Sequence, residues 1–261
     1  MSNVDIAKLA DHLAQAEATG QGVAPLTELV PDITVEQAYH VQLETISRKV
    51  SQGARIVGKK IGLTSKAMQN LLGVGEPDYG HLLDNMEIPN NGVLEASKTI
   101  YPRVEAEIAF VLKKDLEGPR VTELDVLQAT DYVVGALEIV DSRVKDWKIK
   151  LADTVGDNAS SGFFVLGEKK LPVSALSLDQ IGSVLYVNGE IANTGVGAAA
   201  LGSPAKCVAW LANKLHQFGI KLQAGEVILS GALSAAVTAQ PGDTFKARFG
   251  HLGEVSVSFG K

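Results

Sequence analysis

The sequence contains a single cysteine, Cys207, so the chain cannot form an intramolecular disulfide bond. Its thiol lies in an apolar run, which predicts a buried and unreactive side chain. No apolar stretch approaches the roughly 20 residues that a membrane-spanning helix needs. The N-terminus also lacks the basic region and apolar core of a secretory signal. We therefore expect a soluble, cytoplasmic protein.

Positive charge is also scarce. The 261 residues include 24 lysines and arginines against 30 aspartates and glutamates, which gives a formal net charge of −6. Because no basic block interrupts this acidic chain, nucleic acids and anionic membranes are disfavoured as partners. The hydrophobic fraction of 46% and the charged fraction of 21% are typical of a globular protein. They exclude a disordered, collagenous or coiled-coil chain.

Several common functional motifs are missing from the sequence. The glycines between Gly195 and Gly202 do not have the spacing of a dinucleotide loop, and the segment 58–65 lacks the Gly-Lys-Ser/Thr end of a phosphate loop. No Gly-x-Ser-x-Gly nucleophile elbow occurs. The five histidines are scattered without a pair at metal-ligand spacing, which disfavours zinc chemistry.

The hydrophobic period divides the chain into two regions. The first eighty residues are predicted to be helical: apolar residues recur every three or four positions over 6–16, and a capping box at Thr34–Gln37 precedes a second apolar stripe that ends at Val50. From about residue 100 the period is two, which predicts strands over 103–113, 132–140, 162–166, 184–188, 227–231, 244–249 and 255–259, with one helix over 204–216.

Strands outnumber helices in the second region and do not alternate with them, which disfavours a doubly wound parallel sheet. We expect an α+β fold in one folded unit. It would consist of an N-terminal helical region with a lysine-containing loop over residues 1–85 and a β-rich core over residues 86–261.

Two predicted strands carry carboxylates in apolar surroundings. Alternation along 103–112 places apolar residues on one face, whereas Glu105 and Glu107 project from the other, roughly 7 Å apart. The strand 132–140 is apolar on both faces except at Glu138, which predicts a buried carboxylate. An unpaired buried carboxylate costs several kcal/mol and needs compensation by protonation, by an arginine such as Arg103 or Arg143, or by a cation.

Three carboxylates on two strands would offer oxygen ligands that suit Mg²⁺ or Mn²⁺. Spacing alone leaves a metal site and an ion pair equally open. A pair of solvated glutamates on an exposed sheet face is the simpler interpretation of Glu105 and Glu107.

Two adjacent lysines, Lys59 and Lys60, lie in a segment of otherwise apolar and glycine residues. Each could be a solvated surface charge. Gly58 and Gly62 flank Lys60, however, and glycine allows a ligand to approach the backbone closely. The alternative is therefore an ammonium group that meets a bound carboxylate or enolate.

Six short motifs occur in a fixed order along the chain, namely Gly58–Lys66, Glu76–Gly80, Glu105-x-Glu107, Glu138–Arg143, Asp157–Ser161 and Ala199–Pro204. They resemble those of the 2-hydroxypentadienoate hydratase and 4-oxalocrotonate decarboxylase family, within the fumarylacetoacetate hydrolase superfamily. The resemblance extends from about residue 25 to the C-terminus. It implies a mixed β-roll, barrel-like core that binds Mg²⁺ or Mn²⁺ through three acidic residues.

The resemblance also implies roles for individual residues. Glu105, Glu107 and Glu138 match the metal ligands, Lys60 matches the active-site lysine, and Asp78 matches an acid of proton transfer. These matches favour the metal over the ion pair. Ser160 and Ser230 are further candidates, for substrate binding.

The activity that the resemblance implies is a hydro-lyase of bacterial meta-cleavage degradation of aromatic compounds. It would add water to 2-hydroxypenta-2,4-dienoate and give 4-hydroxy-2-oxopentanoate. Lys59 and the segment 146–150 resemble the hydratases, whereas the segments 89–107 and 235–237 resemble the decarboxylases. The alternative activity is therefore that of a metal-dependent 4-oxalocrotonate decarboxylase, which is a carboxy-lyase. A dicarboxylate-specific hydratase and a non-catalytic partner-binding homologue are weaker alternatives. We expect a small-molecule substrate, a homo-oligomer, and a complex with the pathway's decarboxylase or hydratase partner.

Overall fold

The computed structural model describes residues 4–66, 69–70 and 73–261. Residues 1–3, the start of the segment tested above for a secretory signal, lie outside this part. The described helices are α1 (Ile6–Thr19), α2 (Leu26–Leu29), α3 (Val35–Ser51), α5 (Glu123–Ala129), α6 (Leu151–Gly156) and α7 (Pro204–His216). None of these helices is both long and apolar enough to cross a membrane.

The strands of the described residues form two mixed sheets. The larger contains β1 (Ile56–Gly62), β2 (Asp78–Leu83), β4 (Pro102–Leu112), β5 (Thr130–Asp141), β6 (Ser161–Leu166), β9 (Val227–Leu229) and β10 (Val237–Thr238). Its order is β2-β1-β9-β4-β5-β6, with β10 paired to β4. Only β1 and β9 pair in parallel among the described strands of this sheet.

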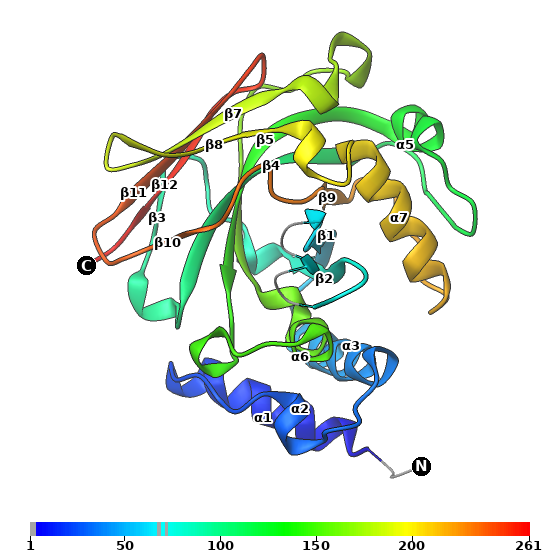
Figure 1. Cartoon of the computed structure of the whole chain (residues 1–261), viewed down its shortest axis with the longest axis vertical. Coiled ribbons are helices and arrows are strands. Elements are labelled where there is room, and N and C mark those ends of the chain that lie inside the picture. Colours follow the sequence, from blue (N-terminus) through cyan, green and yellow to red (C-terminus); the bar gives the residue numbers. More distant parts are fainter. Residues whose placement is uncertain (1–3, 67–68, 71–72) are drawn as a thin grey trace.

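The smaller sheet contains β3 (Gly92–Leu94), β7 (Gly182–Val187), β8 (Glu190–Val196), β11 (Thr244–Phe249) and β12 (Gly253–Phe259). Its order is β3-β12-β11-β7-β8, with β3 parallel to β12. Figure 1 shows the sheets together at one end of the molecule, α1, α2, α3 and α6 at the other, and α5 and α7 along one side. The expected α+β fold with a mixed, curled β core and N-terminal helices is confirmed.

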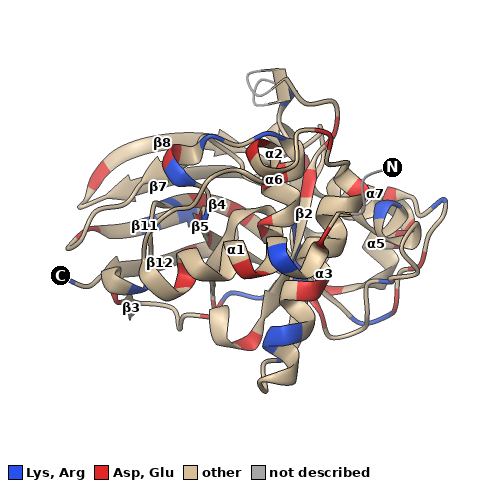
Figure 2. Ribbon diagram, turned by 90° about the horizontal axis from the view of Figure 1, so that it is seen from below, with Lys and Arg blue, Asp and Glu red and all other residues tan. Residues whose placement is uncertain are grey.

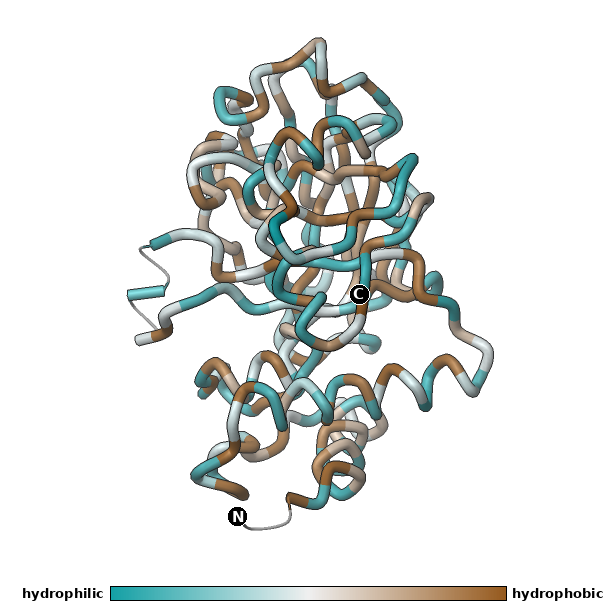
Figure 3. Tube along the Cα trace, turned by 90° about the vertical axis from the view of Figure 1, so that its right-hand side faces the viewer, coloured by the Kyte–Doolittle hydropathy of each residue, from teal (hydrophilic) through white to brown (hydrophobic). Residues whose placement is uncertain are grey.

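The N-terminal helices have the predicted amphipathic character. The capping box of α3 is present, since the Thr34 hydroxyl accepts a bond from the Gln37 N–H while the Gln37 side chain accepts one from the Thr34 N–H. Figure 3 shows hydrophobic and hydrophilic residues alternating along the helices near the N-terminus. Charged residues of both signs are interspersed along α3 (Figure 2), and Lys49 forms an ion pair with Glu17 of α1 at 2.8 Å. Apolar packing and surface ion pairs therefore join α1 to α3.

The prediction of helix throughout the first eighty residues is wrong, because 56–62 and 78–83 are strands and Lys60 lies on β1 rather than in a loop. β1 pairs with β9, which is about 170 residues further along the chain. A local hydrophobic period cannot detect such a distant partner. The edge strand β8 also escaped prediction, because its residues are mostly exposed and lack apolar alternation. The predicted strands of the core and the helix over 204–216 are confirmed, and Cys207 is buried in that helix.

Candidate active site

The three glutamates meet on the larger sheet. Glu105 of β4 lies directly opposite Glu138 of β5 in the antiparallel register, and Glu107 lies two residues further along β4. One carboxylate oxygen from each glutamate lies within 4.8 Å of the others. Glu107 and Glu138 are fully buried, while Glu105 is partly exposed. The apolar residues that alternate with them on β4 pack in the core, as predicted, so these carboxylates are not a solvated surface pair.

Neither arginine proposed from the sequence compensates Glu138. The Arg103 guanidinium lies 4.2 Å from the ring centroid of Trp147, and Arg143 pairs with Asp157. The partner of Glu138 is instead Lys60 of β1, whose Nζ lies 3.3 Å from Glu138 Oε1. Both residues are almost completely buried.

One ammonium does not balance the charge of this cluster. Burial raises the pKa of Glu105 to about 7, with a further rise from the Glu138 charge. Burial and the same neighbour raise the pKa of Glu107 well above its ordinary value. Burial also raises the pKa of Glu138, against the lowering effect of Lys60. Like charges directly opposite each other on neighbouring strands are destabilising, so the cluster favours either bound protons or a bound cation.

The donor set fits a divalent cation with oxygen ligands. Within the described residues, Glu107 Oε1 and both carboxylate oxygens of Glu138 are buried without a hydrogen-bond partner. The other oxygen of Glu107 accepts a bond of 2.8 Å from the Gly231 N–H, which fixes the direction of that carboxylate. Buried carboxylate oxygens that hydrogen bonds leave unsatisfied are suitable ligands for Mg²⁺ or Mn²⁺.

Lys60 is held by more than its ion pair. Its Nζ donates a hydrogen bond of 2.9 Å to the carbonyl oxygen of Ala159. Burial lowers its pKa, but the surrounding carboxylates, Glu138 foremost, raise it more, so the net shift is upward. Lys60 is therefore a fixed cation at neutral pH.

Asp78 of β2 lies beside Lys60. It is opposite Gly62 in the register of β1 and β2, and a Cβ atom at Gly62 would lie only 2.3 Å from Asp78 Oδ1. Glycine is required there to admit the carboxylate. The Thr154 hydroxyl donates a bond of 2.6 Å to Asp78 Oδ2. Asp78 Oδ1 is buried without a hydrogen-bond partner among the described residues.

The two adjacent lysines have different surroundings, and neither is a solvated surface charge. Lys59 points to the opposite side of β1 and pairs with the buried Glu226 at 2.5 Å. Gly58, which we expected to make room for a ligand, instead makes room for the chain of β9: a Cβ atom there would lie 1.9 Å from the Val227 carbonyl oxygen. Lys59 is thus a structural residue of the strand pairing.

The Ala159 carbonyl belongs to an unusual turn. Asn158, Ala159 and Ser160 all have left-handed backbone conformations, with φ of 53°, 50° and 53°. Such a conformation costs about 1 kcal/mol or more for each residue other than glycine, so the surrounding contacts must impose it. The Asn158 side chain does so in part, because it accepts a bond of 2.7 Å from the His81 N–H and donates one of 2.9 Å to the His81 carbonyl.

A cavity of about 560 Å³ opens onto this cluster. Lys60, Asp78, Glu105 and Ser160 line it, while Glu107 and Glu138 lie beneath its wall. Ser230 is not among its lining residues, since its hydroxyl is buried and donates to the Ile108 carbonyl. The remainder of the wall combines apolar and polar residues with the charged Arg103 and Asp146. Its other members are Gly62, Leu63, Thr64, Ser65, Val140, Trp147, Ile149, Thr154, Ala159, Ala199, Ala232, Ser234, Ala235 and Ala236.

Two residues that contribute to the site were not predicted from the sequence. Thr154, which bonds Asp78, lies in the short helix α6, and no motif marks a hydroxyl at that position. Ala159 acts through its carbonyl oxygen, so its side-chain type gives no signal. The resemblance did single out the segment around Ala159, but not the atom that matters.

The model of the fumarylacetoacetate hydrolase C-terminal family matches residues 77–259. The chain belongs to this family. As a family member it is 52% identical over 221 residues to a 2-hydroxypent-2,4-dienoate hydratase of Pseudomonas putida, an alignment that covers 84% of the chain and all of the relative. It is 48% identical to a 2-hydroxyhexa-2,4-dienoate hydratase of Comamonas testosteroni, with 95% and 94% of the two chains covered.

The family also contains a solved structure of very similar shape. It is the 4-oxalocrotonate decarboxylase from Pseudomonas putida G7 in complex with magnesium and adipate. The TM-score is 0.96 at 40% identity, and the alignment covers 99% of this chain and 98% of the other. The relationship to hydratases and decarboxylases expected from the motifs is confirmed.

Proposed function

We propose that this protein is a hydro-lyase that depends on a divalent cation and adds water to 2-hydroxypenta-2,4-dienoate, in the meta-cleavage degradation of aromatic compounds. The observation that carries the proposal is the buried cluster of three glutamates and Lys60 beside a cavity, in a chain 48–52% identical to dienoate hydratases. Each part of the cluster has a chemical task in that reaction.

Glu105, Glu107 and Glu138 would hold Mg²⁺ or Mn²⁺. When bound, the cation supplies Lewis-acid stabilisation of negative charge on the substrate oxygens. A solved relative at 40% identity holds magnesium, which supports the choice of ion.

Lys60 would contact the substrate carboxylate or its 2-oxygen. Its Nζ is fixed by Glu138 and by the Ala159 carbonyl, so the ammonium is already oriented before an anion enters. A preorganised cation in a cavity shielded from water stabilises developing charge more strongly than one in solution.

Asp78 would transfer protons through its Oδ1 atom, because Thr154 occupies Oδ2. The first step removes the 2-hydroxyl proton and adds a proton at C5, which gives a 2-oxo acid with a C3=C4 double bond. Water then adds its oxygen to C4, and a proton adds to C3. The product is 4-hydroxy-2-oxopentanoate, and no oxidant or reductant is consumed.

A 4-oxalocrotonate decarboxylase is the second candidate, because the solved decarboxylase has a TM-score of 0.96. That reaction also builds up enolate charge, so the same cluster would serve it. The higher identity to the hydratases favours hydration. A non-catalytic homologue is disfavoured, since such a protein has no need to keep uncompensated buried carboxylates.

The test follows both substrates with one enzyme preparation. We expect the ultraviolet absorbance of 2-hydroxypenta-2,4-dienoate to decay in the presence of Mg²⁺ or Mn²⁺, with 4-hydroxy-2-oxopentanoate as product and no gas release. Rapid CO₂ release from 4-oxalocrotonate without hydration of the dienoate would assign the second candidate instead.

Further parts of the proposal concern the protein's surroundings and organisation. Ser160 lines the cavity and would contact the substrate, whereas the Ser230 hydroxyl is engaged with Ile108, which makes Ser230 the weaker candidate. We place the enzyme in the cytoplasm as a homo-oligomer, able to associate with the pathway's decarboxylase or hydratase partner. Within the chain, 1–85 and 86–261 would form one folded unit.

A further inference from the structure

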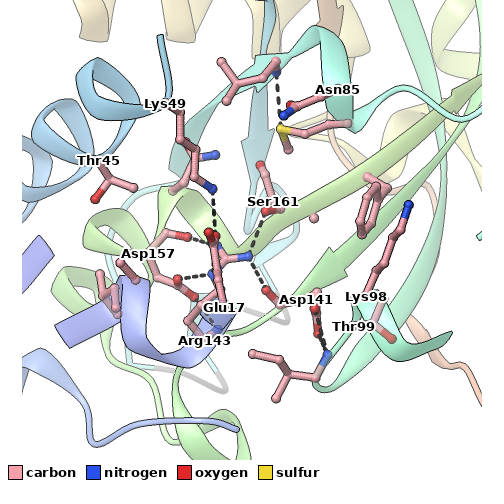
Figure 4. Close-up of a pocket in the computed structure, with 18 of the residues that line it drawn as sticks. Glu17, Thr45, Lys49, Asn85, Lys98, Thr99, Asp141, Arg143, Asp157 and Ser161 are labelled. Carbon is pink, nitrogen blue, oxygen red and sulfur yellow. Dashed lines mark hydrogen bonds and ion pairs between the residues drawn. The ribbon is translucent and has the colours of Figure 1, made fainter. Parts of the chain in front are cut away.

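A second cavity, of about 240 Å³, lies behind the active-site turn (Figure 4). Asp157 and Asn158 line this second cavity, whereas the next two residues, Ala159 and Ser160, line the active-site cavity. Consecutive residues of one turn thus separate the two spaces. The hydrogen bonds drawn in the second cavity include those that hold the backbone of the turn in place.

Arg143 makes most of these hydrogen bonds. Its Nε donates a bond of 2.5 Å to Asp157 Oδ1, and one terminal nitrogen donates to the Asp157 carbonyl. The other terminal nitrogen donates bonds of 2.9 Å to the Ser161 carbonyl and 2.6 Å to the Asp141 carbonyl. A single guanidinium therefore contacts the backbone immediately before and immediately after the left-handed residues 158–160.

Asp157 completes this clamp, which we define as the Arg143–Asp157 pair. Its second oxygen accepts a bond of 3.0 Å from the Arg143 N–H, so three hydrogen bonds link the two residues. Burial raises the pKa of Asp157 to about 6 in spite of Arg143, which leaves the carboxylate ionised at neutral pH. Glu17 of α1 lies 4.0 Å from Arg143 Nε (Figure 4), which places a further negative charge near the guanidinium.

The clamp affects Lys60 through the backbone of the turn. Residues with left-handed backbones relax when their supports are removed. The residue at the middle of the turn is Ala159, whose carbonyl accepts the bond from Lys60 Nζ. A relaxed turn would release that carbonyl, and Lys60 would keep only the Glu138 contact.

We propose that Arg143 and Asp157 are positioning residues, which act on the reaction by holding the Ala159 carbonyl against Lys60 and so directing the ammonium into the cavity. This inference rests on the proposed function for its kinetic readout. Neither residue is proposed to touch the substrate, because both lie on the far side of the turn.

The test compares Asp157→Asn with a matched control, Glu226→Gln. Both changes neutralise a buried carboxylate whose basic partner lies at 2.5 Å, but Glu226 pairs with Lys59 on the other side of β1. We expect both variants to lose a similar amount of thermal stability and to keep the affinity of the wild type for Mn²⁺. Only Asp157→Asn should lose kcat, by tenfold or more, measured at a temperature where all proteins are folded.

A double variant shows whether the effect passes through Lys60. In a Lys60→Ala background, Asp157→Asn should change the remaining kcat by less than about twofold, because the group that it positions is gone. An equal loss in both backgrounds would overturn the proposal, as would an equal kcat loss in Glu226→Gln. If Asp157→Asn does not fold, Arg143→Lys replaces it in the test. Lysine keeps the charge but cannot contact the carbonyls of Asp157 and Ser161 at the same time.

Hydrogen exchange provides a readout that does not depend on turnover. We expect faster exchange over residues 157–161 in Asp157→Asn than in the wild type, with no change over 157–161 in Glu226→Gln. If the wild type is inactive on the dienoate but this exchange pattern appears, the proposed function fails while the clamp stands. Unchanged exchange in Asp157→Asn together with unchanged kcat would reject the clamp alone.

Discussion

Replacing Glu107 by glutamine should make the metal-free protein more stable, although it removes a proposed metal ligand. Glu107 is fully buried, and burial together with Glu138 raises its pKa well above the ordinary value of 4.5. The metal-free folded protein must therefore keep this carboxyl protonated or bear an uncompensated charge. Glutamine has nearly the same shape without that requirement.

The size of the effect follows from the pKa difference. The ordinary pKa of 4.5 lies about 2.5 units below pH 7, and each unit corresponds to about 1.36 kcal/mol, so holding Glu107 protonated costs up to about 3 kcal/mol. Glutamine would keep the bond from the Gly231 N–H, and its amide could donate to an unsatisfied oxygen of Glu138. We expect a gain of about 1–3 kcal/mol, or roughly 2–4 °C in Tm for each kcal/mol.

The assay is thermal or urea unfolding at pH 7, with chelator and then with rising Mg²⁺ or Mn²⁺. The wild type should gain about 2.7 kcal/mol once the cation reaches a hundred times its Kd. Glu107→Gln should gain far less and should lose most activity. Glu226→Gln is the control of opposite sign, because the charge of Glu226 is compensated by Lys59, and its loss should destabilise the protein with or without cation.

A metal-free Glu107→Gln protein that is less stable than the wild type would contradict this prediction. The prediction would also be refuted if both proteins gained equally from the cation. Either result would mean that Glu107 is satisfied without a metal and that the acidic cluster is a structural ion-pair network.

Three further predictions concern the same cluster. Chelation should abolish activity, and Mg²⁺ or Mn²⁺ should restore it while Zn²⁺ does so poorly; full turnover of metal-free protein would contradict the assignment of the three glutamates. Lys60→Ala should lower kcat/KM by two or more orders of magnitude, which corresponds to about 3 kcal/mol. It should also destabilise the metal-free protein, because Glu138 loses its partner. Unchanged steady-state kinetics would show that Lys60 is misassigned. The pKa of Glu105 rises from its usual 4.5 to about 7 on folding, so between these pH values the folded state holds a proton that the unfolded state has released. The stability of the metal-free protein should therefore fall as the pH rises from about 5 to about 8. Urea midpoints that rise over this range would contradict the prediction.

The β core could be predicted from the sequence because its central strands are long and have clear apolar patterns. β4 spans eleven residues and has an apolar face that alternates with its glutamates, whereas β5 spans twelve residues and is apolar on both faces over most of its length, which indicated that Glu138 would be buried. β1 and β2 could not be predicted in this way, since their strand character depends on pairing with each other and with the distant β9.

The residue types in the sequence indicated the acidic cluster, but they did not identify Lys60 as the ion-pair partner of Glu138. Lys60 approaches Glu138 only because β1 and β5 belong to one sheet, and no spacing along the chain encodes that distance. The turn at Ala159 shows the same limit more clearly. Its contribution is a backbone oxygen whose direction depends on Arg143 and on the Asn158 contacts with His81.

The adjacent lysines of β1 have a consequence for how that strand finds its place during folding. Successive residues of a strand point to opposite faces, so a slip of one position would exchange the two ammonium groups. Lys60 would then point to the face on which Ile61 packs in the core, and either Glu138 or Glu226, depending on the direction of the slip, would lose its cation. The two buried ion pairs therefore penalise a slip in either direction, because each direction leaves one buried glutamate without a lysine. The glycine-rich strand that carries the proposed catalytic lysine is confined to a single alignment by electrostatics rather than by apolar packing alone.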